Sequence, residues 1–477
     1  MLSSNGGSNI KDFGRVLVSN GIILLLGFLI TFLLPLKLTI EDFGYWQLYF
    51  FYSGFVGLFM FGFLDGIHLK YAGVTYSSID KSEFRLYFRC TCCLSLIMFI
   101  IMSFFIIVYI KDYDRMFVLF FINLNIIIFN INGFFTHINQ VTSRFKYYSW
   151  GIILDRIIFV ILIIPMLFMS LDSYKYYLII NVISRVAVVI YNISISRELV
   201  FGESMKLMGN YNQIIDLIKC GIPLTISAIL SMLLISFPRL IVDNFFGIEE
   251  FGMFSFANSM LSIAVQLVIA VSTVLYPLLR KMEKDNYEIV NNLLNSSVWI
   301  FGSIMLCAYF PIVFFLKNYL PKYVPILEYL YFLFPMMIYQ CKNNIVITTF
   351  YKVLRLEKVM LINNVGGLLV NLLVTICSYY MFESILSIIV ASVVCFAAWN
   401  YYVDWYLKKK SKWNFKKKYY EPFIILAFLM STQIENWVTG LFVYLVLLLC
   451  VVMVFKASFL EWYDIVISIL RNKKEKY

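Results

Sequence analysis

Charged residues are scarce in this sequence, and histidine is almost absent. Asp, Glu, Lys and Arg make up 14% of the 477 residues, and there are two histidines, His68 and His137. A soluble domain carries about 25% charged residues, so the composition argues against an aqueous globular protein. The two histidines and the Cys90-x-Cys92-Cys93 cluster lack the partners that a metal site or nucleophilic catalysis requires, and we interpret the cysteines as small apolar residues.

Apolar residues are abundant instead, at 61% of the chain with 46 Phe and 34 Tyr. About 20 apolar residues in a helix cross a bilayer core of roughly 30 Å. Fourteen such segments are predicted, of which the thirteenth is short and the last two could form one re-entrant hairpin. They are residues 16–36, 45–64, 88–110, 116–138, 150–170, 176–195, 216–237, 251–275, 295–316, 325–349, 359–381, 384–406, 421–433 and 437–455.

Lys and Arg are distributed unevenly between the two sides that these spans define. With the N-terminus inside, 29 of the 39 basic residues lie at inside segments, seven lie at outside loops, and three lie within spans. Basic residues favour the cytoplasmic side, so both termini are predicted to be cytoplasmic in an inner-membrane protein. The net charge of +11 then reflects topology and attraction to anionic membrane lipids, and no nucleic-acid partner is indicated.

A five-residue motif occurs twice: residues 40–44 (IEDFG) are repeated 208 positions later as residues 248–252 (IEEFG). Each copy follows the first span of its half of the chain. Thr39-x-x-Asp42 ahead of the first copy is a capping-box pattern, which predicts a helix start. Six spans separate the copies, so the halves face the same way, as in transporters built from parallel repeats. We predict an all-α polytopic membrane protein with lobes at 1–205 and 206–407, each of six helices, and a C-terminal segment at 408–477 with two more helices.

Several enzyme classes lack their signatures. No P-loop occurs, so ATP hydrolysis is not expected. No outside loop exceeds about a dozen residues, which leaves no room for an external catalytic domain. We therefore expect neither an enzyme nor a cofactor.

Four segments resemble the O-antigen and polysaccharide flippases of the Wzx type, which belong to the multidrug/oligosaccharidyl-lipid/polysaccharide exporter superfamily. They are residues 40–47 (IEDFGYWQ), 221–225 (GIPLT), 246–257 (FGIEEFGMFSFA) and 276–280 (YPLLR). By helix count the resemblance covers the whole chain. It departs from the family where an Asp-Arg pair is common late in the seventh span: this chain has Pro238-Arg239, with Asp243 one turn further on.

The resemblance implies a function in lipopolysaccharide biosynthesis and polysaccharide export. The expected substrate is an oligosaccharide repeat unit on undecaprenyl diphosphate, moved between leaflets by alternating access of the two lobes. A polysaccharide polymerase and chain-length machinery would be partners.

A diphosphate needs cations inside the membrane, and Arg185 lies near the middle of the span 176–195. A cation at that depth is costly unless it faces a cavity or a partner. Asn181, Arg185 and Asn192 are four and seven residues apart and share one helical face, so they could line a polar path. The planar donor fork of Arg suits phosphate.

Three further charged residues lie within spans. Lys342 could face the cavity or extend to the interface, and Arg156 could bind substrate or pair with its neighbour Asp155. Asp155 is the candidate coupling residue, because it is the one carboxylate predicted more than a turn inside a span.

The fourth span carries two polar stripes on opposite faces. One consists of Asn123, Asn130 and His137, and the other of Asn125, Asn132 and Asn139. One stripe would face the substrate, with Asn123 and Asn130 as candidates, while the other would bond a neighbouring helix. The sequence does not decide between the faces.

Three alternatives stay open. A multidrug antiporter would share the fold, but a cationic drug requires intramembrane acids, whereas the spans hold three cations and one acid. A major-facilitator transporter also has parallel six-helix halves. A membrane polysaccharide polymerase or glycosyltransferase would act on similar substrates, but would require a large outside loop or an Asp-rich sugar-nucleotide site.

Overall fold

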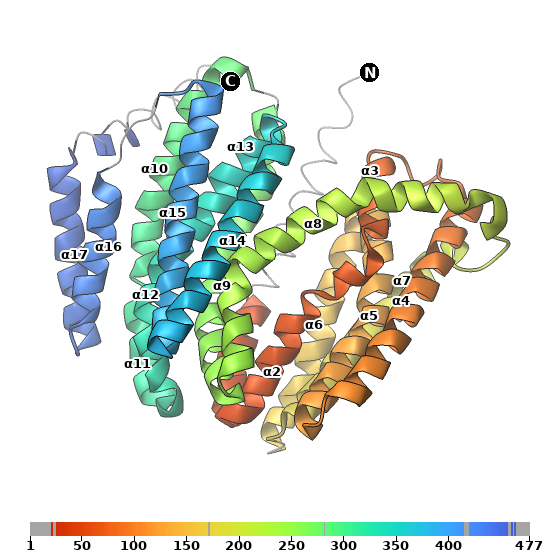
Figure 1. The fold of residues 1–477 in the computed structure, drawn as a ribbon, viewed down its shortest axis with the longest axis horizontal. Helices are drawn as coiled ribbons and strands as arrows, with labels where there is room; N and C mark the ends of the chain where they lie inside the picture. Colours follow the sequence, from red (N-terminus) through yellow and green to blue (C-terminus); the bar gives the residue numbers. More distant parts are fainter. Residues whose placement is uncertain are drawn as a thin grey trace. The chain divides into compact units, whose positions relative to one another are not determined.

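The computed structural model describes residues 21, 25–169, 172–280, 282–414, 419–456, 459–460 and 462–463. Every regular element within these ranges is helical, which confirms the predicted all-α fold (Figure 1). The start of the first expected span and the expected tail beyond residue 463 lie outside the described residues. The chain divides into an N-terminal unit, Met1–Met232 with Gly247–Gly252, and a C-terminal unit, Leu233–Phe246 with Met253–Tyr477.

The N-terminal unit begins with an apolar helix at Leu25–Lys37, and its further elements follow in chain order. They are α2 (Ile40–Ser53), η1 (Val56–Met60), α3 (Phe63–Lys70), α4 (Lys81–Tyr109), α5 (Tyr113–Val141), α6 (Phe145–Phe168), α7 (Tyr174–Ile195), η2 (Arg197–Leu199) and the first part of α8 (Leu207–Phe245). Side chains cap the starts of four helices by accepting a backbone N–H that has no partner within the helix, namely Thr39, Asp80, Asp112 and Ser173. The predicted cap at Thr39 is confirmed, since its Oγ1 accepts from the Asp42 N–H at 3.0 Å.

The second expected span, 45–64, is not one straight helix. The chain bends by 66° between Ile40–Met60 and Phe63–Lys70. Phe61 and Gly62 both adopt left-handed backbone, with φ of 50° and 80°. A side chain on Gly62 would also meet the backbone of Gly221 and Ile222 in α8, so the bend lies where two backbones approach closely and glycine is required.

The division between the two units runs through α8. An added Cβ on Gly66 would overlap the Leu217 backbone, and one on Gly221 would overlap Gly62, so the first part of α8 packs tightly on α3. The boundary expected from the sequence, 205/206, precedes this helix, whereas the units separate after Met232. The difference follows from this glycine-mediated packing, which assigns the first part of α8 to the N-terminal unit.

The C-terminal unit contains the end of α8 and most of α9, followed by a longer series of elements. They are α9 (Ile248–Arg280), η3 (Lys284–Asn286), α10 (Tyr287–Leu306), α11 (Tyr309–Tyr319), η4 (Pro321–Ile326), α12 (Leu327–Lys342), the π-helical turn η5 (Asn343–Ile347), α13 (Thr348–Val353), α14 (Glu357–Phe382), α15 (Ile385–Ser411), α16 (Tyr420–Thr432) and α17 (Trp437–Val454). Two expected spans contain a local change of helix geometry: 295–316 includes the turn between α10 and α11, and 325–349 includes η5. Each still lies in one helix long and apolar enough to cross a membrane, Lys284–Tyr319 and Pro321–Val353.

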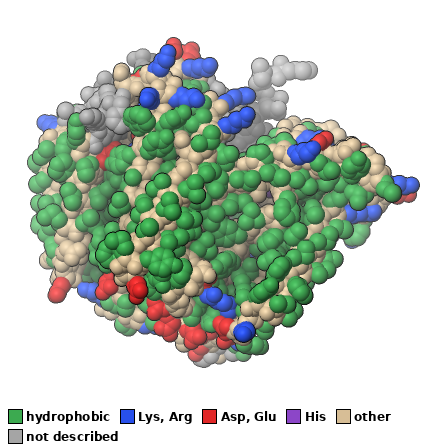
Figure 2. Space-filling view, viewed as in Figure 1, with side chains coloured by type: hydrophobic (Ala, Val, Ile, Leu, Met, Phe, Trp, Pro, Cys, Tyr) green, Lys and Arg blue, Asp and Glu red, His purple; other side chains and the backbone are tan. Residues whose placement is uncertain are grey.

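The membrane-crossing character of the helices is clear from length and composition. Among the described residues, ten helices are long and apolar enough to cross a bilayer, or eleven if the bent pair counts as one span. Leu25–Lys37 and Tyr420–Thr432 are shorter apolar helices. Hydrophobic side chains cover the sides of the helices, while Lys, Arg, Asp and Glu gather toward their ends on the face shown (Figure 2). The protein is thus a multi-pass membrane protein.

The two repeated pentads pack against each other within the N-terminal unit. An added Cβ on Gly44 would meet the Ile248 carbonyl oxygen, and one on Gly252 would lie 2.7 Å from the Gly44 Cα. Phe51 and Phe251 pack edge to face nearby, with ring centroids 5.8 Å apart. The repeat therefore joins the start of α2 to the start of α9 through glycines.

Segments predicted on the same side of the membrane meet at the same end of the N-terminal unit. At one end, the Tyr174 N–H donates to Asp42 Oδ1 at 3.1 Å, which joins the starts of α7 and α2. At the other end, Lys81 at the start of α4 pairs with Glu198 in η2. This hydrogen bond from Lys81 holds the pKa of Glu198 below its usual range.

In the C-terminal unit, too, segments predicted on the same side of the membrane meet at the same end. Lys317 Nζ at the end of α11 donates to the Glu435 carbonyl oxygen at 3.2 Å, between α16 and α17. The Asn414 N–H, just after α15, donates to Glu288 Oε1 at 3.0 Å at the start of α10. The expected outside loops and the expected inside loops thus form separate groups.

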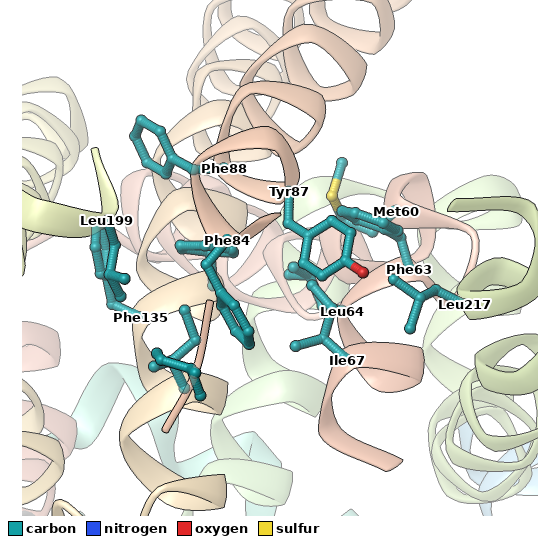
Figure 3. Packing of buried hydrophobic residues seen from close by; sticks show 13 residues of the cluster. Met60, Phe63, Leu64, Ile67, Phe84, Tyr87, Phe88, Phe135, Leu199 and Leu217 are labelled. Carbon is teal, nitrogen blue, oxygen red and sulfur yellow. The ribbon is translucent and has the colours of Figure 1, made fainter. Parts of the chain in front are cut away.

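A tightly packed apolar core holds α3 in the N-terminal unit (Figure 3). Phe63 and Ile67 of α3 lie among Phe84 and Tyr87 of α4 and Leu217 of α8. All five side chains are buried, so α3 is fixed between its neighbours.

Candidate functional site

Arg185 lies at the centre of a hydrogen-bond network inside the N-terminal unit. Its Nη1 donates to Asn125 Oδ1 at 3.0 Å. Asn125 Nδ2 donates to the Tyr49 hydroxyl at 2.8 Å, and that hydroxyl donates to Asn181 Oδ1 at 2.8 Å. The network joins α7, α5 and α2. Among the described residues, Arg185 donates one side-chain hydrogen bond, through Nη1.

Arg156 of α6 lines the same cavity as Arg185 but is held differently. Among the described residues, Arg156 has no hydrogen bond and no ion pair, although Asp155 acts on it electrostatically. Asp155 instead accepts a hydrogen bond from the Ser184 hydroxyl at 3.1 Å. The cavity therefore contains a guanidinium whose donors have no acceptor within the described part of the chain.

The cavity has a volume of about 250 Å³ and is lined by residues of α5, α6 and α7. Arg156, Arg185 and Asp155 provide its charged groups, and Asn132 and Asn192 line it as well. Two cations face one carboxylate, so the cavity has a net positive charge. Such a surface suits an anion better than a cation.

A second cavity of about 460 Å³ adjoins the first within the N-terminal unit. Phe129, Asn132 and Thr136 line both cavities. Asp65, His137 and Thr225 are among the further residues that line the larger one. The two cavities thus share part of their lining, and the larger one extends toward α3 and α8.

The stripe Asn125, Asn132 and Asn139 is the one directed toward these charged groups. Asn125 bonds Arg185, while Asn132 and Asn139 line the smaller cavity. Asn123 of the opposite stripe donates to the Phe99 carbonyl and to Ser103 of α4, at 2.9 and 2.7 Å.

The remaining amide candidates take different positions. Asn130 approaches the Val56 carbonyl at 3.5 Å and also lines the larger cavity. Asn192 donates to Asn132 Oδ1 at 3.2 Å and lines the smaller cavity, whereas Asn181 is buried behind Tyr49. The structure therefore brings Arg185, Arg156, Asp155 and Asn192 together, and it places Asn123 and Asn181 in contacts between helices.

Lys342 lies apart from this site, in a buried charge cluster of the C-terminal unit. Its Nζ is 3.0 Å from Asp404 Oδ2, and Lys408 Nζ is 3.3 Å from the same oxygen. The Tyr401 ring lies 5.0 Å from Lys342 Nζ, and its hydroxyl donates to Glu421 Oε2 at 2.6 Å. Two buried cations are thus balanced by two buried carboxylates.

Sequence reasoning missed several of these partners. Tyr49 was one of 34 tyrosines without a distinguishing pattern. Asp404 and Glu421 lie close to the ends of expected spans, where acids are ordinary. One pattern in the sequence does point to the C-terminal cluster: Asp404 and Lys408 are four residues apart on one helix, a spacing that lets opposite charges pair.

The fold and the cavity define a helical multi-pass membrane protein with a positively charged cavity in its N-terminal unit, the class of flippases and transporters. The chain belongs to the family of polysaccharide biosynthesis proteins, whose sequence pattern matches residues 10–283. No curated protein matches the sequence.

Solved structures share the fold over most of the chain. The lipid II flippase MurJ in an inward closed conformation has a TM-score of 0.66 and 14% identity, covering 92% of this chain and 98% of MurJ. An inward-facing multidrug resistance MATE family transporter of the MOP superfamily has a TM-score of 0.62 and 12% identity, covering 82% and 94%. A MOP superfamily transporter from Pyrococcus furiosus has a TM-score of 0.55 and 10% identity, covering 84% and 96%. These similarities confirm the fold that the sequence resemblance implied.

Proposed function

We propose that this protein is a flippase that moves undecaprenyl-diphosphate-linked oligosaccharide repeat units across the bacterial cytoplasmic membrane. The repeat units would be those of O-antigen or a similar surface polysaccharide. The observation that carries the proposal is the smaller cavity of the N-terminal unit, where Arg156 and Arg185 outnumber the single carboxylate of Asp155. Membership of the polysaccharide biosynthesis family supports it.

The two guanidiniums have complementary roles in this proposal. Arg185 is oriented by Asn125, and Arg156 has donors without a protein acceptor among the described residues. Pairs of oxygens on each phosphate of a diphosphate can accept two parallel N–H bonds from a planar guanidinium. Binding the head group would thus provide acceptors for donors that have none among the described residues.

The asparagines and hydroxyls of the adjoining cavity would bind the first sugars, while the polyprenyl tail stays in lipid. Movement of the N-terminal and C-terminal units would open the substrate site alternately to the two sides of the membrane. Both chain termini would be cytoplasmic. We propose no covalent chemistry. A polysaccharide polymerase and chain-length machinery would take up the product on the outer side.

Export of a cationic drug is the second candidate function, and the charges do not favour it. The smaller cavity has a positive excess. In the C-terminal unit, Lys342 and Lys408 neutralise the buried Asp404. Within the described residues, neither cluster presents an excess of carboxylates to a cation.

The test uses a strain in which the gene is deleted and complemented with Arg156 and Arg185 variants. Deletion should remove long surface polysaccharide and leave drug sensitivity unchanged. Export per molecule should fall in the order wild type, Lys, Ala, Glu at either position. A hydrogen bond to a charged group contributes about 1.5–3 kcal/mol, so each Ala variant should weaken substrate affinity roughly 10- to 150-fold.

Arg89→Ala is the matched control, because Arg89 is exposed on α4 and donates to the Gly202 carbonyl outside the cavity. Arg156→Ala gives the clearer result of the two Ala variants. It removes no hydrogen bond between described residues, so protein abundance should stay normal. Full export per molecule in Arg156→Glu, or drug sensitivity with intact polysaccharide on deletion, would refute the proposal.

A further inference from the structure

The two histidines of this chain, 69 residues apart, meet inside the N-terminal unit. His68 lies on α3 and His137 on α5, and their Nδ1 atoms are 3.2 Å apart. The rings meet edge to face with centroids 5.2 Å apart. This distance and geometry indicate a direct imidazole–imidazole hydrogen bond.

The hydrogen bond limits the number of protons that the four ring nitrogens of the pair can hold. Two facing Nδ1 atoms require one proton between them, because two lone pairs or two N–H groups would repel. The neutral pair can take up one more proton at an Nε2 position and keep the hydrogen bond. A second added proton would place two positive charges in contact, which is costly away from water. The geometry therefore allows the pair to bind a single added proton.

Asp65 extends this site toward α8. It lies one turn before His68 and accepts a hydrogen bond from the Thr225 hydroxyl of α8. Asp65 and His137 line the same cavity. A protonated pair would thus have a carboxylate nearby as its counter-charge.

Other charged groups on the surrounding elements are engaged elsewhere or exposed. Lys70 of α3 lies 3.6 Å from Glu83 of α4, which also accepts from Tyr71 and Tyr87. On α8, Asp216 and Lys219 are exposed.

On α6 and α7, Asp155, Arg156 and Arg185 line the adjoining smaller cavity. Within the described residues, no group of three His, Cys, Asp or Glu side chains is placed to hold a metal ion.

The histidine pair is connected to the proposed head-group site. His137 and Asp65 line the larger cavity, which shares Asn132 and Thr136 with the cavity of Arg156 and Arg185. A positive charge on the pair would attract an anion in that shared space. Because linkage is reciprocal, a bound anion would equally favour protonation of the pair.

We propose that His68 and His137, with Asp65 as counter-charge, form a proton-binding site that is loaded together with the anionic head group. The proposal rests on the proposed function for its anion. It supplies a proton site on α3 and α5 that is separate from Asp155. The Thr225 contact would transmit the change in charge to α8.

The first test concerns the proton site alone and requires no substrate. The protein is purified without a histidine tag, in the presence of EDTA, with isotope-labelled histidine, and titrated by NMR in lipid nanodiscs. Both imidazoles should shift together in a single one-proton step. In His68→Asn and His137→Asn, the remaining imidazole should titrate at a different pH. Independent titration in the wild type, at the pH values of the single variants, would overturn the proposal.

The second test measures coupling with farnesyl diphosphate as the probe. Calorimetry in two buffers of different ionisation enthalpy should show proton uptake on binding. The affinity should change with pH by about 5- to 150-fold relative to the His68→Asn/His137→Asn variant, which reports the titration of the probe itself. Equal proton uptake by wild type and double variant would overturn the coupling.

The two tests separate this inference from the proposed function. Failure of farnesyl diphosphate to bind at any pH would count against the anion site and the coupling together. The paired titration would then still decide the proton site by itself.

Discussion

At the scale of single residues, the sequence offers both Arg156 and Lys342 as cations that could bind substrate. The structure distinguishes their roles by the partners of each side chain. Arg156 lines a cavity without a hydrogen-bond acceptor among the described residues, whereas Lys342 is within 3.0 Å of Asp404 and almost completely buried. A cation with an unused donor set can bind a ligand. A cation that neutralises a buried acid stabilises the fold.

We therefore expect Lys342→Met to reduce stability rather than substrate affinity. Breaking a buried ion pair on one side typically costs about 3–5 kcal/mol, and the remaining Lys408–Asp404 contact should keep the loss at the low end. Thermal unfolding of the purified protein in detergent would measure the loss. The double variant Lys342→Met/Asp404→Asn should recover part of it.

Lys410→Met is the matched control, because Lys410 is exposed on the same helix as Asp404. If Lys342→Met unfolds like the control but loses polysaccharide export per molecule, Lys342 belongs to the transport path after all.

At the scale of elements, the repeated pentad is explained by the contact it makes. The acids lie in the first turns of α2 and α9, and the glycines allow the two helices to approach until Gly44 meets Ile248 and Gly252 meets Gly44. The sequence indicated the repeat but not this contact. Similarly, the bend at Phe61–Gly62 depends on the approach of α8, which no local pattern in 45–64 contains.

Gly44→Ala and Gly252→Ala should each destabilise the protein by about 1–3 kcal/mol or more, because the added methyl group meets backbone atoms that cannot rotate away. Lower abundance in the membrane and a lower unfolding temperature would show this. Gly366→Ala is the control, since its Cβ would have no neighbour within 4 Å and alanine favours a helix. Three variants of equal stability would contradict the packing role of the pentads.

At the scale of the whole molecule, the distribution of basic residues predicts which helix ends are cytoplasmic. Within the C-terminal unit, Asn318 lies at the end of α11, and Ser411 at the end of α15 lies near the start of α10. A reporter fused at Ser411 should therefore report the cytoplasm, and one at Asn318 should report the outside.

The paired reporters for this test are an alkaline phosphatase and a green fluorescent protein, which are active on opposite sides of the membrane. Fusions at both sites should give reciprocal signals. The same compartment at both sites would contradict the predicted topology.

The sequence by itself determined the membrane class, the all-helical fold and the family resemblance. These follow from local and one-dimensional properties: in a bilayer, backbone polar groups must be satisfied within each span, so long apolar segments become helices whatever their neighbours. The fold similarity to MurJ and the MATE transporter agrees with that reasoning.

Only the tertiary structure decided which polar residues face each other. Arg185 meets Asn125 and Tyr49 from two other helices, and His68 meets His137 across 69 residues of chain. Side-chain hydrogen bonds and cavities depend on the rotation and spacing of packed helices, and an isolated span does not specify them. Hence the cationic residues could be found from the sequence, while the distinction between a ligand-binding guanidinium and a neutralised ammonium required their neighbours.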